Sequence, residues 1–91
     1  MEIIAKVVEI GNPEVFTTSS GNTIQKVDVL LNQGYNQFIV TAFDKVATEL
    51  QANKPIVGGV YLAEVSFGIG SSNGNGKRFQ NVRLHRLAPL F

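Results

Sequence analysis

The sequence predicts an all-β domain: a closed antiparallel barrel of five strands, with one short helix between the third and fourth strands. Apolar and polar residues alternate along most of the chain, which is the pattern of half-buried strands. A helical spacing of apolar residues occurs only once. Clusters of glycine, asparagine and proline separate the alternating segments. We expect residues 1–91 to form a single domain that buries roughly 60 to 68% of the surface of the unfolded chain.

The first strand is expected at about residues 2–10, EIIAKVVEI, which are rich in β-branched side chains and end at Gly11-Asn12-Pro13. The polar stretch FTTSSGN, residues 16–22, is expected to be a connection. In it, Phe16 is either a stacking residue of the loop or an apolar anchor that holds the loop down. The second strand follows at residues 23–32. Its expected core face carries Gln25, Val27, Val29 and Leu31.

A hairpin and the helix come next. Asn32-Gln33-Gly34 is expected to turn the chain into a third strand at residues 35–43. The helix is expected over residues 44–54, with Asp44 as its N-terminal cap and Lys54-Pro55 closing it. The core-facing residues of these two elements are expected to be Phe38, Val40, Ala42, Val46, Ala47 and Leu50.

The fourth strand is expected at residues 58–69. Both of its faces begin with apolar residues, so alternation leaves the orientation of Tyr61 open. Glu64 and Ser66 lie on the same face and favour it as the outer one. This assignment buries Phe67.

The stretch GSSNGNGKRF, residues 70–79, leads into a fifth strand at residues 77–88 that Pro89 ends. A phosphate-binding Walker A loop has the pattern G-x4-G-K-S/T and leads into a helix. Here five residues separate Gly70 and Gly76, and an arginine follows the Gly-Lys pair. Asn-Gly pairs are instead typical of hairpin turns, so we expect a long hairpin tip that is mobile until a ligand binds.

The order of the expected elements is strand, strand, strand, short helix, strand, strand. This is the order of the OB fold, a five-stranded Greek-key barrel. An SH3-like barrel has the same number of strands but normally carries a single helical turn near its end. The sequence therefore predicts an OB fold whose helix plugs one end of the barrel.

Charge is distributed unevenly along the chain. Residues 77–91 contain four basic and no acidic residues, a net charge of +4, whereas residues 1–76 contain four lysines and seven acidic residues, a net charge of −3. The basic segment indicates an anionic partner or, alternatively, a charged edge strand. We expect no enzyme and no metal or other cofactor, because the chain lacks cysteine and has His85 as its one histidine. Without a signal peptide pattern or an apolar span, a cytoplasmic protein is expected.

Aromatic and basic side chains occur together on the expected outer face of the barrel. Unpaired bases stack on aromatic rings while lysines and arginines contact phosphates, so this combination is typical of single-stranded nucleic-acid binding. Packing of the two third-strand rings at the barrel ends is the alternative. The outward residues of the third and fifth strands are Tyr35, Gln37, Ile39, Thr41, Phe43, Phe79, Asn81, Arg83 and His85. Of these, the expected nucleic-acid contacts are Tyr35, Gln37, Phe43, Phe79, Arg83 and His85. The expected phosphate contacts are Lys26, Lys45, Lys77, Arg78, Arg83 and Arg86.

Three segments resemble the bacterial replicative single-stranded DNA-binding proteins: FIVTAFDKVATEL, GGVYLAEVSF and NGKRFQNVRLHRL, within roughly residues 35–87. They look like that family's third strand with its aromatic-x-Lys entry to the helix, its Gly-x-Val-Tyr fourth strand, and its last strand. The resemblance implies that Phe43, directly before Asp44-Lys45, stacks on DNA bases. It also implies that Gln37 stands where the family often has another stacking residue.

The resemblance does not include that family's acidic tail, because the last residues here are APLF, so we do not expect recruitment of partners through such a tail. In its size the chain is also similar to filamentous-phage helix-destabilising proteins and to primosomal replication protein N. We expect sequence-tolerant binding of single-stranded DNA, with RNA as the alternative ligand, by a homodimer or homotetramer in replication, recombination or repair. The alternative function is a protein-interaction OB barrel that docks on replication or phage proteins through its open edge and its LAPLF end.

Overall fold

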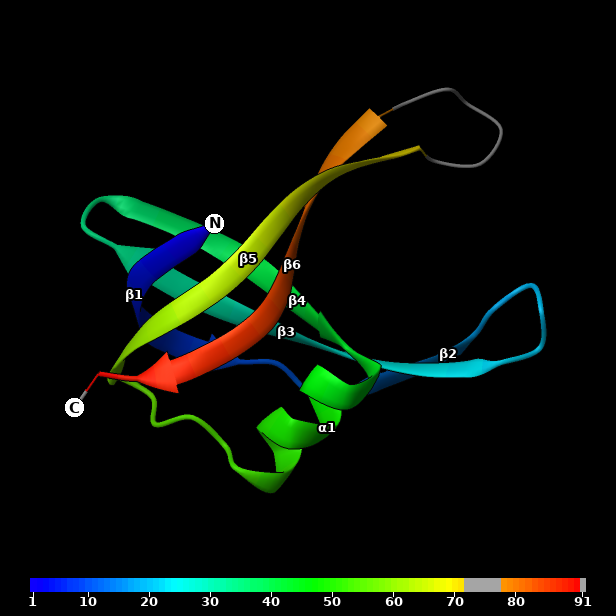
Figure 1. The fold of residues 1–91 in the computed structure, drawn as a ribbon, viewed down its shortest axis with the longest axis horizontal. Helices are drawn as coiled ribbons and strands as arrows, with labels where there is room; N and C mark the ends of the chain where they lie inside the picture. The colour runs from blue at the N-terminus through cyan, green and yellow to red at the C-terminus, as the bar shows by residue number, and fades with distance from the viewer. Residues whose placement is uncertain (72–77, 91) are drawn as a thin grey trace.

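Six strands and one helix make up the part of the chain that the structure describes (Figure 1). The structure is a computed structural model that describes the backbone of residues 1–71 and 78–90 and the side chains of residues 1–68 and 81–90. In chain order the elements are β1 (Glu2–Ile10), β2 (Glu14–Thr17), β3 (Thr23–Gln33), β4 (Asn36–Phe43), α1 (Asp44–Ala52), β5 (Val60–Ser71) and β6 (Arg78–Pro89).

The strands form one sheet that closes on itself. Their order is β1-β5-β6-β4-β3-β2, and β1 also pairs with β3, which completes the barrel. A bulge between Val7 and Glu9 bends β1, so that its first half pairs with β5 and its second half with β3. Among the described strand residues, all pairings are antiparallel except that of β4 with β6, which share the single registered pair Thr41 and Arg83. This is the predicted five-stranded barrel with its first strand in two pieces.

The second piece, β2, was not expected, because residues 16–22 were predicted to be a polar connection. Instead Glu14 to Thr17 pair with Lys26 to Thr23, and the β2–β3 hairpin extends from the barrel (Figure 1). Gly11 lies at the break between the pieces, where its N–H donates to the carbonyl of Asp28 at 2.7 Å. A Cβ at Gly11 would lie 3.0 Å from that oxygen, so a side chain here would push the two strands apart.

The core lies inside the barrel and under the helix. The expected inward residues of β3 and β4 are buried, except that Gln25 and Phe38 are half-buried, and Tyr61, whose orientation alternation left open, is buried too. The hydroxyl of Tyr61 accepts the N–H of Ile56 at 2.8 Å. Helix α1 buries Ala47 and Leu50 against the barrel. Figure 1 shows it covering one end, as predicted.

The start of α1 differs from the expectation. Asp44 does not cap the helix: the N-cap position is Phe43, and no side chain caps it by a hydrogen bond. Asp44 is the first helical residue and has a φ of 48°, in the left-handed region. Aspartate tolerates this conformation better than most side chains do, and here it turns the chain sharply from β4 into α1. The turn between β3 and β4 also starts later than expected, because Gln33 is still in β3 and Tyr35 lies in the turn.

Strands β5 and β6 form the expected hairpin, paired from Tyr61 with Pro89 to Ser71 with Arg78. A bulge next to Glu64 places His85 as the extra residue of β6. The far half of the hairpin, here called the β5–β6 ribbon (residues 66–71 and 78–83), rises beyond the barrel (Figure 1). The tip, residues 72–77, and with it the predicted mobility of the loop and the position of Lys77, lies outside the described residues.

Phe67, which was predicted to be buried, is 47% exposed. It does lie on the inward side of β5, opposite Val82 and two residues after the buried Val65. The prediction failed because the barrel has already ended at this point of the strand.

Within residues 1–71 and 78–90, no helix is long and apolar enough to cross a membrane.

Candidate nucleic-acid interface

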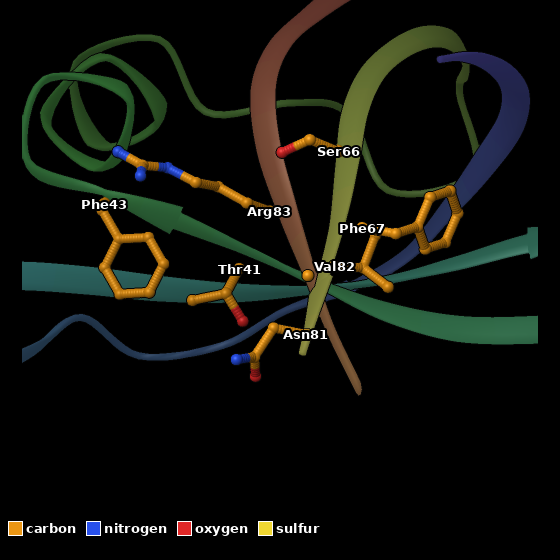
Figure 2. Close-up of a pocket in the computed structure, with 8 residues that line it drawn as sticks. Thr41, Phe43, Ser66, Phe67, Asn81, Val82 and Arg83 are labelled. Atoms are coloured by element: carbon orange, nitrogen blue, oxygen red, sulfur yellow. The ribbon is translucent and has the colours of Figure 1, made fainter. Parts of the chain in front are cut away.

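A hollow of about 300 Å³ lies on the outside of the barrel at the foot of the β5–β6 ribbon (Figure 2). Strand β4 supplies one wall, and the ribbon supplies the other. We call it the outer groove. Its lining residues are Thr41, Phe43, Ser66, Phe67, Gly68, Asn81, Val82 and Arg83.

Phe43 and Arg83 are the central pair of the outer groove. Phe43 is the last residue of β4 and is half-buried; Arg83 comes from β6, where the two strands pair through Thr41. The Arg83 guanidinium lies over the Phe43 ring, 5.3 Å from its centroid, a cation–π contact. A ring and a guanidinium plane both stack on nucleobases, so this pair, here called the platform, places two stacking groups and one positive charge together at the surface.

Polar side chains surround this platform. The Thr41 hydroxyl donates to Oδ1 of Asp28 at 2.7 Å, across the β3–β4 pair. Ser66 Oγ lies 2.7 Å from Nε2 of His85, across the β5–β6 pair. Asn81 is exposed beside them, and its amide carries both donors and an acceptor. These groups can bond to base edges or sugars without selecting one base, because hydroxyl and amide groups donate as well as accept.

The cations near the groove differ in how far their charge is already compensated. Lys26 lies 3.5 Å from the Glu14 carboxylate and Arg86 3.7 Å from that of Glu64. Among the described residues, Arg83 and Lys45 form no ion pair. Lys45 is exposed in the first turn of α1, two residues after Phe43. Arg83 and Lys45 therefore carry the least compensated positive charge around the platform, where a phosphate would gain most from it.

The other predicted contacts lie elsewhere. Tyr35 is fully exposed in the β3–β4 turn and Gln37 is exposed near the start of β4, so both are at the opposite end of that strand from Phe43. His85 is exposed on β6 just beyond the groove. Arg78 and Phe79 lie on β6 by their backbone, but their side chains are outside the described residues. The structure thus brings together Phe43 and Arg83, with Lys26 opposite Phe43 in the neighbouring strand.

Several groove residues were not among the predicted contacts. Alternation places Thr41 and Asn81 on the outer faces of their strands, so that signal was present in the sequence, although neither residue type marks a binding site. Ser66 and Gly68 carry no signal of their own. They line the groove because the pairing register sets them opposite Arg83 and Asn81.

The chain has an OB fold, as a comparison with solved structures shows. The second OB-fold domain of replication protein A from Methanococcus maripaludis, solved by NMR, superposes with a TM-score of 0.68, and the alignment covers 98% of this chain and 81% of that one. The sequence identity over the match is 15%, so the likeness is one of fold. No protein-family model matches the chain, and no curated protein sequence matches it.

Proposed function

We propose that this protein binds single-stranded DNA without strong sequence preference and catalyses no reaction, acting in the cytoplasm in replication, recombination or repair. The observation that carries the proposal is the contact of the Arg83 guanidinium with the Phe43 ring, in a groove where Arg83 is the charged residue among the described lining residues. In OB folds, the face of the second and third barrel strands and the hairpin loops beside it commonly bind oligonucleotides. The corresponding strands here are β3 and β4, and β4 forms one wall of the outer groove.

The proposed contacts divide into two kinds. Bases stack on Phe43 and Arg83, and stacking tolerates any sequence because every base presents a flat π face. Phosphates lie toward Arg83 and Lys45, with Lys26 and Arg86 reaching them once their ion pairs open. A surface ion pair costs little to open, typically about 0 to 1 kcal/mol, so the side chains of Lys26 and Arg86 remain available to contact phosphates. RNA offers the same contacts, so poly-U is the comparison ligand in every titration.

Binding of oligo-dT, followed by fluorescence anisotropy at several salt concentrations, tests the proposal. A protein that contacts Z phosphates of a single strand gives a log–log slope of affinity against salt of about −0.7Z. Four phosphate contacts, for example, give a slope of about −2.8. Absence of binding at low salt would contradict the proposed function.

Phe43→Ala is expected to weaken oligo-dT binding by about 5- to 150-fold, because one stacked base contributes about 1 to 3 kcal/mol. The loss should be similar for oligo-dT and for mixed sequences. Ile56→Ala is the matched control, since it removes an exposed apolar side chain from the connection between α1 and β5. An unchanged affinity of Phe43→Ala, in a variant that remains folded by circular dichroism, would assign Phe43 to packing.

Self-association is also proposed, as a homodimer or homotetramer, and an apolar row on the outside of the barrel supports it. Ile4, Leu62 and Ala88 are register partners across β1, β5 and β6, and Ile4 is exposed. Glu2 and Lys6 flank Ile4 on the same outward face. In a face-to-face dimer whose twofold axis crosses β1 at Ile4, Glu2 of one copy meets Lys6 of the other, so the surface is self-complementary.

Ile4→Asp is expected to convert the oligomer to monomers, because it places two carboxylates at the twofold axis. Light scattering coupled to size-exclusion chromatography measures the mass, and Ile56→Asp is the control for a new surface charge. A monomeric wild type would show that the apolar row is not a self-association surface.

The second candidate function is a protein-interaction OB barrel that docks on replication or phage proteins. It is favoured by the low net charge of +1 and by the exposed Leu90 next to the apolar row. A pull-down with and without residues 88–91 separates it from the first. Capture of a replication protein that depends on these residues, by a chain that does not bind oligo-dT, would favour this function.

A further inference from the structure

A second hollow, of about 330 Å³, lies on the other side of the β5–β6 ribbon from the outer groove. It opens between the ribbon and the first residues of β4, at the mouth of the barrel. We call it the inner cleft. Its lining residues are Ile3, Gln33, Asn36, Gln37, Phe38, Phe67 and Val82.

Phe67 is the exposed aromatic wall of the inner cleft. Its register partner is Val82, whereas Ser66 is paired with Arg83, so the two sides of the ribbon carry different chemistry. Figure 2 shows the Phe67 ring on the opposite side of the ribbon from Phe43 and Arg83. Almost half of the Phe67 surface is open to solvent, so part of the ring can contact a ligand.

The lining of the inner cleft suits an uncharged, flat ligand. None of the seven lining residues that the structure describes carries a charge. Two phenylalanines and two aliphatic side chains form the walls, and Gln33, Asn36 and Gln37 bring amide groups to the cleft. The Gln33 amide is held in place because its Nε2 donates to the carbonyl of Ile4 at 3.0 Å, which leaves its Oε1 as an acceptor. A nucleobase matches this lining: its faces are apolar, and its edge carries donors and acceptors.

The two hollows lie on either side of the same two ribbon residues. Phe67 and Val82 line both of them, one from each side of the ribbon. Strand β4 also connects them, since Gln37 and Phe38 near its start border the inner cleft while Phe43 at its end borders the outer groove. A bound single-stranded nucleic acid that runs from Phe43 along β4 therefore reaches the inner cleft next.

We propose that the inner cleft is a second base-binding site, in which one base of the bound single strand stacks on Phe67 and bonds by its edge to the amides of Gln33, Asn36 and Gln37. The inference rests on the proposed function, because the same single-stranded DNA molecule occupies the outer groove. The lining, uncharged among the described side chains, assigns the cleft to a base and leaves the phosphates to the outer groove. The strand thus passes the edge of the ribbon between the two sites.

Single-tryptophan variants test this directly, because the chain contains no tryptophan. Phe43→Trp reports on the outer groove, Phe67→Trp on the inner cleft, and Ile56→Trp is the control on a distant surface. Each variant is titrated with oligo-dT from about 3 to 16 nucleotides, the range of site sizes of OB folds. We expect quenching of Phe43→Trp by the shortest oligonucleotides that bind, quenching of Phe67→Trp by longer ones only, and none of Ile56→Trp.

Phe67→Ala provides the matching affinity measurement. It should weaken the binding of the longer oligonucleotides by about 5- to 150-fold and leave the shortest ones unchanged. Quenching of Phe43→Trp without quenching of Phe67→Trp at any length would overturn the inference and leave the proposed function intact. Absence of oligo-dT binding by the wild type would overturn the proposed function itself.

Discussion

Val65 and Phe67 lie two residues apart on the same side of β5, yet Val65 is 1% exposed and Phe67 47%. The difference comes from what stands opposite. Val65 pairs with the buried Leu84 inside the barrel, whereas Phe67 pairs with Val82 in the ribbon, beyond the pair Thr41 and Arg83 that joins β6 to β4. One continuous hairpin therefore has a structural half, which fills the core, and a half whose inward side faces an open cleft. The face of a strand on which a residue lies therefore does not by itself decide whether that residue is buried.

The largest expected effect is a difference in the free energy of unfolding between a variant in the barrel half of the β5–β6 hairpin and one in the ribbon half. Leu84→Ala should lower the free energy of unfolding by about 2 to 5 kcal/mol, because Leu84 is 0% exposed and its loss leaves a cavity. Phe67→Ala should cost about 1 kcal/mol, since a half-exposed ring gains only part of the 1.5 to 3 kcal/mol of full burial. Urea denaturation of both variants measures this. Equal losses would show that Phe67 is part of the core.

The next effect concerns the corner that sets the position of Phe43. Asp44 has a φ of 48°, a conformation that costs most side chains about 1 to 2 kcal/mol. Asp44→Val should therefore destabilise the protein by about 1 to 2 kcal/mol and weaken oligo-dT binding, because Phe43 is the preceding residue. Asp44→Gly is the control, because glycine adopts positive φ without strain. If both variants unfold at the same urea concentration, the corner does not depend on this conformation.

The smallest effect compares two arginines of β6. Arg83 contacts the Phe43 ring in the outer groove, whereas Arg86 lies on the barrel half and is paired with Glu64. Arg83→Ala should reduce the magnitude of the salt slope of oligo-dT binding by about 0.7, the value for one phosphate contact. It should cost at most about 0.5 to 1 kcal/mol of stability, as for an exposed cation–π pair.

Arg86→Ala serves as the reference for Arg83→Ala, with the same change of charge on the same strand. We expect a smaller change of slope for it, because its ion pair with Glu64 already compensates part of the charge. A larger change for Arg86→Ala would move the phosphate path from the outer groove to the barrel half of the hairpin.

Much of the fold was predictable because it depends on local sequence patterns. The first strand was expected at residues 2–10 and is found at Glu2–Ile10, since a β-branched run ends there at a glycine–asparagine–proline turn. Alternation assigned the buried Val40 and the outward Phe43 to opposite sides of β4. These inferences need only the period of two of an extended backbone, which strand residues obey away from bulges.

The failed predictions concern positions that local patterns do not describe. The strand β2 forms because residues 14–17 find partners in β3, although the sequence around them is polar. Aspartate is a residue type that often caps helices, but Asp44 instead adopts a positive φ at the sharp turn from β4 into α1. For the candidate site, Phe43 and Arg83 were each expected to face outward, but their contact was not predicted.

The sequence by itself thus determined the chain order of the five expected strands, the place of the helix and the side to which most strand residues point. The tertiary structure alone decided where the barrel closes. That closure depends on the register of β4 against β6, strands that lie about 40 residues apart and share one pair, Thr41 and Arg83. Because the register of distant strands is set by the packing of the whole core, it decides that Arg83 meets Phe43 and that the inward side of Phe67 remains open.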